Sequence, residues 1–234
     1  MQTTLVAPHP RVPRSVHPLK IVAVGDSLVY GYGDPEGGGW VERLRRQWMA
    51  PGSPGHVVYN LGIRGDGIRQ VSQRFESEFR HRGELRNRVP DLLILAVGVN
   101  DSARLNRPDG RNFTEFDRFQ HDLGRLLDHA TQLCPVLFVG MVPVDERKMP
   151  FLDCLYYNHA DQHHYKEATQ VACHDRRIPY LDIFSRWISQ GDQWCRERML
   201  DDGLHPNVLG YQTLLADVLA WQPFVERVAA ISPH

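Results

Sequence analysis

A serine, an aspartate and a histidine have the types and spacing that nucleophilic chemistry needs. Ser27 follows a short apolar run near the start of the chain, and Asp202 and His205 lie close together near its end. A serine hydroxyl is a weak nucleophile at neutral pH, so it needs an imidazole base within hydrogen-bond reach and a carboxylate that fixes the tautomer of that base. Ser27, His205 and Asp202 could therefore act as nucleophile, base and orienting acid.

Acyl transfer also needs hydrogen-bond donors for the negative oxygen that forms on the substrate. The backbone N–H groups of Ser27 and Gly65 and the side-chain amide of Asn100 could supply them. Gly62 lies in the same segment as Gly65, so it is an alternative donor, and Asn100 could instead cap the segment that follows it. We interpret the neighbouring Asp26 and Asp101 as structural hydrogen-bond acceptors.

Each of these segments must be positioned by a regular element, and the sequence contains five short apolar runs that predict strands. They are bounded by polar residues or glycine, as strands buried on both faces of a parallel sheet usually are. The predicted strands cover residues 21–25, 56–60, 92–97, 136–142 and 178–183.

Helix-length segments separate the strands, and we expect helices over residues 40–49, 68–84, 114–133, 156–176 and 207–221. Strands that alternate with helices predict a parallel sheet covered by helices on both faces, a three-layer α/β fold. Ligands of such folds bind at the carboxyl ends of the strands, where Ser27, Gly65 and Asn100 are expected. No linker or internal repeat interrupts residues 19–234, which we expect to form one domain. The proline-containing residues 1–18 predict an extended arm.

Four blocks of this sequence resemble those of the GDSL, or SGNH, hydrolase family and occur in that family's order. They are GDSL at residues 25–28, NLGIRGD at 60–66, GVND at 98–101 and DGLH at 202–205. The resemblance implies a flavodoxin-like, mainly parallel five-stranded sheet. It also implies a serine esterase, lipase or acylhydrolase that cleaves carboxylic esters or thioesters through an acyl-enzyme.

The family roles match this sequence residue by residue. They make Ser27 the nucleophile and an oxyanion donor, Asp202 the orienting acid and His205 the base, with Gly65 and Asn100 as further donors. We prefer Gly65 to Gly62 because the donor glycine of the family commonly precedes an aspartate, here Asp66. The main alternative is a protein that keeps this fold but only binds a ligand.

A nucleotide-binding site and a metal site are two alternatives to the hydrolase site. Glycines at 31, 33 and 37–39 follow the first strand but do not form G-x-G-x-x-G or G-x-x-x-x-G-K-[ST], so nucleotide binding is disfavoured and this loop is expected to shape the rim of the crevice. His159, His163 and His164 could hold a metal with Asp153 or Asp161, but the sequence has no H-E-x-x-H, and we expect no metal and no cofactor. Residues 144–165 could instead form a lid or a pocket wall.

Composition limits the partners. The chain has 27 lysine and arginine residues and 28 aspartate and glutamate residues, so its net charge is −1. A chain with this charge does not attract nucleic acid or anionic membranes through its overall electrostatic field. The sequence shows no apolar stretch of membrane-spanning length and no signal-peptide pattern, so we expect a cytoplasmic protein with a small-molecule ester or thioester as substrate. The four cysteines form no C-x-x-C pair and are expected to be free thiols. The oligomeric state does not follow from the sequence.

Overall fold

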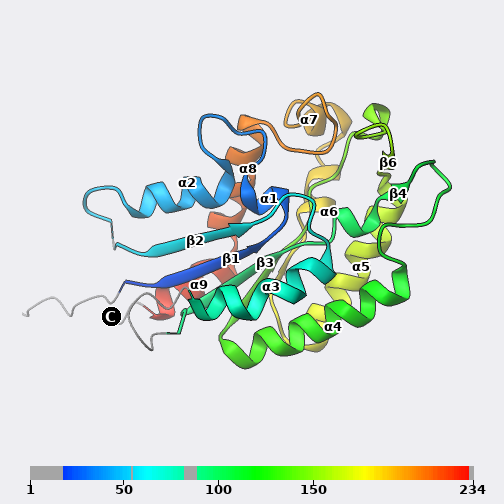
Figure 1. The fold of residues 1–234 in the computed structure, drawn as a ribbon. Helices are drawn as coiled ribbons and strands as arrows, with labels where there is room; N and C mark the ends of the chain where they lie inside the picture. The colour runs from blue at the N-terminus through cyan, green and yellow to red at the C-terminus, as the bar shows by residue number, and fades with distance from the viewer. Residues whose placement is uncertain (1–17, 54, 82–88, 232–234) are drawn as a thin grey trace, which may run out of the picture.

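A parallel five-stranded sheet forms the centre of the computed structural model, which describes residues 18–53, 55–81 and 89–231. The strands lie in the order β2-β1-β3-β5-β7 (Figure 1). Counted along the chain, this is the order 2-1-3-4-5 of flavodoxin-like folds, so the predicted fold class is confirmed. The strands are β1 (Lys20–Gly25), β2 (Val57–Gly62), β3 (Leu92–Ala96), β5 (Val136–Val139) and β7 (Tyr180–Leu181).

The central strands are buried along their whole length. Every residue of β1 and of β3 is buried, which explains why both read as unbroken apolar runs. Gly25 pairs in register with Gly62 of β2 and with Ala96 of β3. The three strands therefore end together, and the segments that follow them begin at one edge of the sheet.

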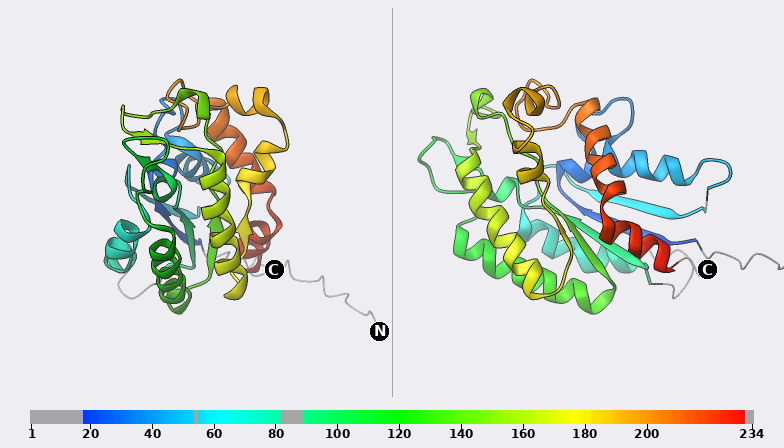
Figure 2. Two further views of the ribbon diagram at one scale, coloured as in Figure 1. Left: turned by 90° about the vertical axis from the view of Figure 1, so that its right-hand side faces the viewer. Right: turned by 180° about the vertical axis from the view of Figure 1, so that it is seen from behind.

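Helices cover both faces of the sheet (Figure 2). On one face, α2 packs against α8 and α8 against α9, and on the other α4 packs against both α3 and α5. Fully buried aromatic side chains such as Trp40 of α2 and Phe119 of α4 fill the two layers between helices and sheet. The bounds are α2 (Gly39–Trp48), α3 (Ile68–His81), α4 (Phe116–Leu133), α5 (His159–Asp175), α8 (Val208–Ala220) and α9 (Gln222–Ile231).

Shorter elements connect these layers. Strands β4 and β6 pair antiparallel and lie beyond the carboxyl ends of the main strands (Figure 1). The short elements are α1 (Ser27–Tyr30), η1 (Asn100–Ser102), β4 (Arg104–Leu105), η2 (Glu146–Lys148), β6 (Leu155–Tyr156), α6 (Ile183–Ile188) and α7 (Asp192–Arg196).

Two of the predicted elements are shorter in the structure than expected. The helix expected over residues 156–176 begins only at His159, because Tyr156 belongs to β6 and the side chain of Asn158 caps the helix by accepting the Asp161 N–H at 2.7 Å. The strand expected over residues 178–183 is limited to Tyr180–Leu181, because the Asp182 carboxylate caps α6. At both places a side chain that caps a helix determined where the element begins or ends, although the apolar pattern of the sequence continued past that point.

Other strand boundaries shifted by one to three residues. The strand expected over 56–60 begins at Val57 and continues to Gly62, and the one expected over 136–142 ends at Val139. Helix α3 ends at His81, and residues 82–84 of its predicted range lie outside the described residues.

The predicted arm, residues 1–18, lies outside the described residues except for Pro18. All four cysteines are free. In the part of the chain that is described, no helix is both long enough and apolar enough to cross a membrane.

Candidate active site

Ser27 lies at the carboxyl end of β1, where this strand turns directly into α1 (Figure 1). The turn is tight: a Cβ atom on Gly25 would lie 2.0 Å from the carbonyl oxygen of Ala96, so only glycine fits there. A side-chain oxygen of Asp26 then accepts the N–H of Leu28 at 2.9 Å and caps α1. Ser27 is thus held by a rigid strand and a capped helix rather than by a free loop.

Asp202 and His205 lie in the turn that leads into α8. One oxygen of Asp202 accepts the N–H groups of Leu204 and His205, at 2.9 and 3.0 Å. The other oxygen is 2.7 Å from Nδ1 of His205. The carboxylate therefore fixes both the turn and the orientation of the imidazole ring.

The structure brings the beginning and the end of the chain together at this point. Nε2 of His205 lies 2.9 Å from Oγ of Ser27, across a separation of 178 residues in the sequence. Both side chains are buried, and the ring of Tyr32 packs edge-on against the imidazole with its centroid 4.6 Å away. The three residues that the sequence singled out thus form one hydrogen-bonded chain.

The charge state of Asp202 suits an orienting acid. Burial raises the pKa of this carboxyl, but hydrogen bonds from the His205 side chain and from the N–H groups of His205 and Leu204 outweigh burial and leave the pKa below its usual value. Asp202 is therefore ionised at neutral pH, and its negative charge lies against Nδ1 of His205.

Three hydrogen-bond donors lie around Ser27. The N–H groups of Ser27 and Gly65 donate no hydrogen bond to any described residue, and Asn100 lines the same pocket as Ser27 and Gly65. Gly62 does not line this pocket, and its N–H already donates to the side chain of Asn60 at 3.0 Å. It packs closely on the backbone of α1, because a Cβ atom on Gly62 would lie 2.0 Å from the backbone nitrogen of Tyr30. The geometry favours Gly65 over Gly62 as a donor to a ligand.

The amide of Asn100 is held from both sides. Its Nδ2 atom donates to the carbonyl oxygen of Asp66 at 2.9 Å, and its Oδ1 atom accepts the hydroxyl of Tyr157 at 3.3 Å. These two contacts fix which end of the amide carries the N–H groups, and one N–H of Nδ2 is left over. The Asp66 segment is in turn held by Arg74, which binds the Asp66 carboxylate at 2.7 Å.

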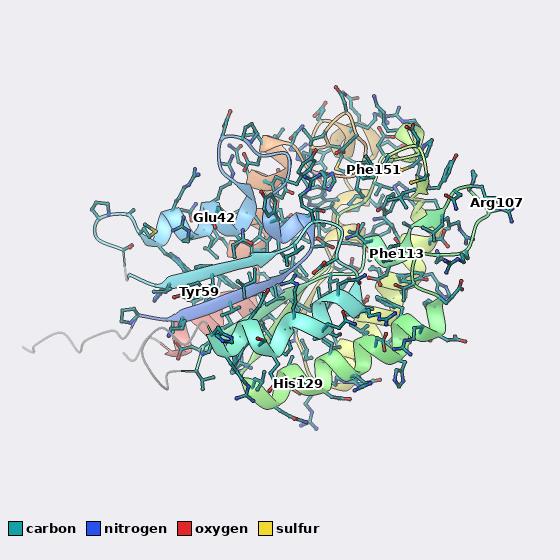
Figure 3. The ribbon with its side chains drawn as sticks, in the orientation of Figure 1. Glu42, Tyr59, Arg107, Phe113, His129 and Phe151 are labelled. Carbon is teal, nitrogen blue, oxygen red and sulfur yellow. The ribbon has the colours of Figure 1, made fainter. Side chains whose placement is uncertain are left out.

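A pocket of about 440 Å³ opens above Ser27, and most of its wall is apolar. Phe113 and Phe151 contribute to it from segments beyond the carboxyl ends of the strands (Figure 3). The segment 144–165 supplies part of the wall, which agrees with one of the two roles considered for it. The lining residues are Ser27, Arg64, Gly65, Asn100, Ala103, Phe113, Phe151, Leu152, Leu155, Tyr157, Leu204 and His205.

Several of these contributors were not identified from the sequence. Tyr157 orients Asn100 but lies outside the four sequence blocks, and nothing in its neighbours marks it. Tyr32 contacts His205 from the glycine-containing loop that was expected to shape the rim. An aromatic residue flanked by Gly31 and Gly33 was the only sequence signal for this contact.

Three of the residues considered for a metal site are engaged in other contacts. Asp161 binds Arg104 at 2.7 Å, and Nε2 of His159 lies 2.8 Å from the carbonyl oxygen of Val144. The ring of His164 packs on Phe116. No group of three or more histidine, cysteine, aspartate or glutamate side chains in the described ranges is arranged to hold a metal ion.

Two buried carboxyl groups lie behind the candidate site. Asp101 accepts the N–H of Ile68 and the hydroxyl of Thr114, the structural role expected for it, yet burial outweighs these bonds and raises its pKa to about 6. Asp26 is wholly buried, and its second oxygen has no hydrogen-bond partner among the described residues. Burial, with smaller contributions from Asp101 and Asp66, raises the pKa of Asp26 to about 7 although the Leu28 N–H lowers it.

Replacing Asp26 with asparagine is expected to stabilise the protein by an amount that grows with pH. Because folding raises the pKa of this carboxyl from 3.8 to about 7, the folded chain keeps a proton that the unfolded chain has lost, and wild-type stability falls as pH rises through this interval. Asparagine cannot ionise and keeps an oxygen for the Leu28 N–H. Urea unfolding at about pH 4, 6 and 8 should show a difference that approaches about 4 kcal/mol at the highest pH.

The control for this measurement is Asp109→Asn, since the Asp109 side chain is 81% exposed. It should change the free energy of unfolding by less than about 0.5 kcal/mol at every pH. A stabilisation by Asp26→Asn that did not vary with pH would show that Asp26 does not keep its proton on folding.

Comparisons with known proteins agree with the fold and place the chain in a family. The model of the GDSL-like Lipase/Acylhydrolase family matches residues 23–213. No curated protein sequence matches the chain. A lipase/acylhydrolase from Enterococcus faecalis is 23% identical, with a TM-score of 0.68 over 86% of this chain and 93% of that one.

Two esterase structures are similar at lower identity. An acetylxylan esterase from Geobacillus stearothermophilus is 15% identical, with a TM-score of 0.65 over 92% of this chain and 96% of that one. The psychrotrophic esterase EstA from a Pseudoalteromonas species is 17% identical, with a TM-score of 0.61 over 85% of this chain and 93% of that one. The likeness to these structures shows a shared fold, and the family match over residues 23–213 shows more: the chain belongs to the GDSL-like lipase/acylhydrolase family, a family of hydrolases.

Proposed function

We propose that this protein hydrolyses carboxylic esters, or thioesters, in two steps through an acyl-enzyme on Ser27. One observation carries the proposal: Oγ of Ser27, Nε2 of His205 and the Asp202 carboxylate form a continuous hydrogen-bonded chain at the floor of a largely apolar pocket. This is the arrangement that activates a serine hydroxyl as a nucleophile.

In the first step, Oγ of Ser27 attacks the carbonyl carbon while its proton moves to Nε2 of His205. The carbonyl oxygen takes the negative charge, and the N–H groups of Ser27 and Gly65 and the Nδ2 group of Asn100 donate to it. When the tetrahedral intermediate collapses, the bond to the leaving group breaks and His205 returns the proton to the departing alcohol or thiol. Asp202 stabilises the imidazolium that exists between these events.

In the second step, water replaces the leaving group. His205 removes a proton from the water as it attacks the acyl carbon, and the same three donors hold the oxyanion. Collapse then releases the acid and returns the proton to Oγ of Ser27. The protein supplies every group that this cycle uses, so the mechanism requires no cofactor.

The pocket narrows the class of substrate. Its volume of about 440 Å³ is in the range of pockets that hold small organic molecules, and its aromatic and aliphatic wall fits an apolar substituent. The three similar structures are a lipase/acylhydrolase and two esterases, which supports an ester as the scissile group.

A fluorophosphonate probe tests the proposal directly, because it reacts with an activated serine. The wild-type protein should become labelled, and digestion with mass spectrometry should place the label on Ser27. A panel of p-nitrophenyl esters and acyl thioesters of graded chain length then measures turnover. An unlabelled Ser27 together with no turnover across the panel would favour the alternative, a ligand-binding protein with this fold.

A further inference from the structure

Among the described residues that line the pocket above Ser27, one side chain is permanently charged, that of Arg64. Aspartate and glutamate are absent from the lining residues, which are otherwise apolar or neutral apart from the titratable His205. An anionic group that entered the pocket would therefore meet a positive charge and no negative one. A cationic group would meet the like charge of Arg64 there.

Contacts with the site hold this charge in place. The guanidinium carbon of Arg64 lies 3.7 Å from the centroid of the Tyr32 ring, and that same ring packs against His205 at 4.6 Å. Arg64 also directly precedes Gly65 in the chain. A guanidinium that stacks by its face on an aromatic ring keeps its N–H edges free for a ligand, and those edges match the two oxygens of a carboxylate or phosphate.

Arg64 has no carboxylate partner of its own among the described residues. The nearest acidic residue in the sequence, Asp66, is bound by Arg74 at 2.7 Å. Arg43, by contrast, is neutralised by Asp34, whose carboxylate it binds at 2.7 Å. The positive charge of Arg64 is thus exposed at the pocket wall, and no carboxylate in the described part of the chain neutralises it.

We propose that Arg64 binds an anionic group of the substrate, so that the preferred ester carries a carboxylate or phosphate in addition to an apolar part. This proposal rests on the proposed ester hydrolysis and specifies its substrate class. An uncompensated guanidinium beside a reactive serine raises the affinity of an anionic ester selectively, while a neutral ester of the same size gains nothing from the charge.

Matched pairs of esters test the proposal. The first pair, para-acetoxybenzoate and its methyl ester, differs by an anionic group in the leaving alcohol. The second pair, monomethyl adipate and dimethyl adipate, differs by an anionic group in the acyl part. A third anionic ester, para-acetoxyphenyl phosphate, distinguishes phosphate from carboxylate. Because the intrinsic reactivities differ, the quantity to compare is the ratio of kcat/KM for the anionic member to that for the neutral member.

The ratio of kcat/KM values should fall about 10-fold in Arg64→Gln for at least one pair. A change of this size is expected when one charge-assisted hydrogen bond to the substrate is lost. Arg64→Lys should retain part of the preference, and rising salt should weaken the wild-type preference toward that of Arg64→Gln. The matched control is Arg227→Gln, which removes an exposed arginine from α9, near the amino ends of the strands (Figure 1). Its ratio should equal that of the wild type.

A binding measurement separates this proposal from the proposed catalysis. With Ser27→Ala, which is not expected to turn over ester, calorimetry should give tighter binding of para-acetoxybenzoate than of its methyl ester. This difference should disappear in the double variant Ser27→Ala with Arg64→Gln. An unchanged ratio in Arg64→Gln for all pairs, or an equal loss for anionic and neutral members, would overturn the role of Arg64 while leaving ester hydrolysis in place. Absence of turnover in the wild type with retained selective binding would overturn hydrolysis alone.

Discussion

Alanine in place of Ser27 is expected to lower kcat for p-nitrophenyl acetate by about 10⁴- to 10⁶-fold, to a level set by the remaining donors and by binding. The alanine side chain lacks the oxygen that forms the acyl-enzyme, so His205 would have no hydroxyl to activate at 2.9 Å. Steady-state assays on the purified variant measure the loss, and the fluorophosphonate probe should no longer label the protein.

The control for this variant is Ser72→Ala. Ser72 lies on α3, and its hydroxyl donates to the carbonyl oxygen of Ile68 at 2.7 Å within that helix. Its kcat should stay within about 2-fold of the wild type, since surface and helix changes of this kind have small effects. If Ser27→Ala retained wild-type turnover while folded to the same melting temperature, another residue would be the nucleophile.

The presence of the buried strands β1 and β3 follows from the sequence because each is an uninterrupted apolar run between turns, whereas the flavodoxin-like sheet was implied by the family resemblance. The run 21–25 lies within β1, and the run 92–97 contains β3, because both strands are buried on two faces. Two-residue strands such as β4 and β6 give no such signal. They exist because the segments 104–105 and 155–156 meet in space, and a pattern along the chain does not record that meeting.

The ends of elements were harder to predict than their presence. At Asn158 and Asp182 a side chain caps a backbone N–H three residues later, and each cap begins a helix inside a segment that looked continuous. Asparagine and aspartate are common in turns as well as at the start of helices. The sequence alone therefore does not show which asparagine or aspartate will cap a helix.

The sequence predicted which residues form the candidate site. The structure adds the distances between their side chains and the neighbouring residues that hold them in place. The blocks around Ser27, Gly65, Asn100 and His205 pointed to one edge of the sheet. Tyr157 was missed because its contact with Asn100 spans 57 residues and depends on the path of the segment before α5. The free charge of Arg64 was equally hidden, because the pairing of Arg74 with Asp66 becomes apparent only once the chain has folded.

Asparagine in place of Asp202 is expected to lower kcat by about 10⁴-fold while the protein stays folded. The substituted amide can keep its oxygen on the N–H groups of Leu204 and His205, which places its NH₂ group against Nδ1 of His205. Nδ1 must then accept a hydrogen bond, so the ring proton moves to Nε2. An imidazole protonated at Nε2 cannot take the proton of Ser27, and the negative charge that stabilised the imidazolium is also lost.

The neighbouring Asp201 supplies a matched control, because it is the same residue type one position earlier and its side chain is fully exposed. Asp201→Asn should keep kcat within about 2-fold of the wild type. Circular dichroism and melting temperature check that both variants fold, and a simple structural defect in Asp202→Asn would lower the melting temperature together with kcat. Equal kcat values for Asp202→Asn and Asp201→Asn would mean that the carboxylate 2.7 Å from His205 orients nothing that the reaction needs, and that the imidazole works without it.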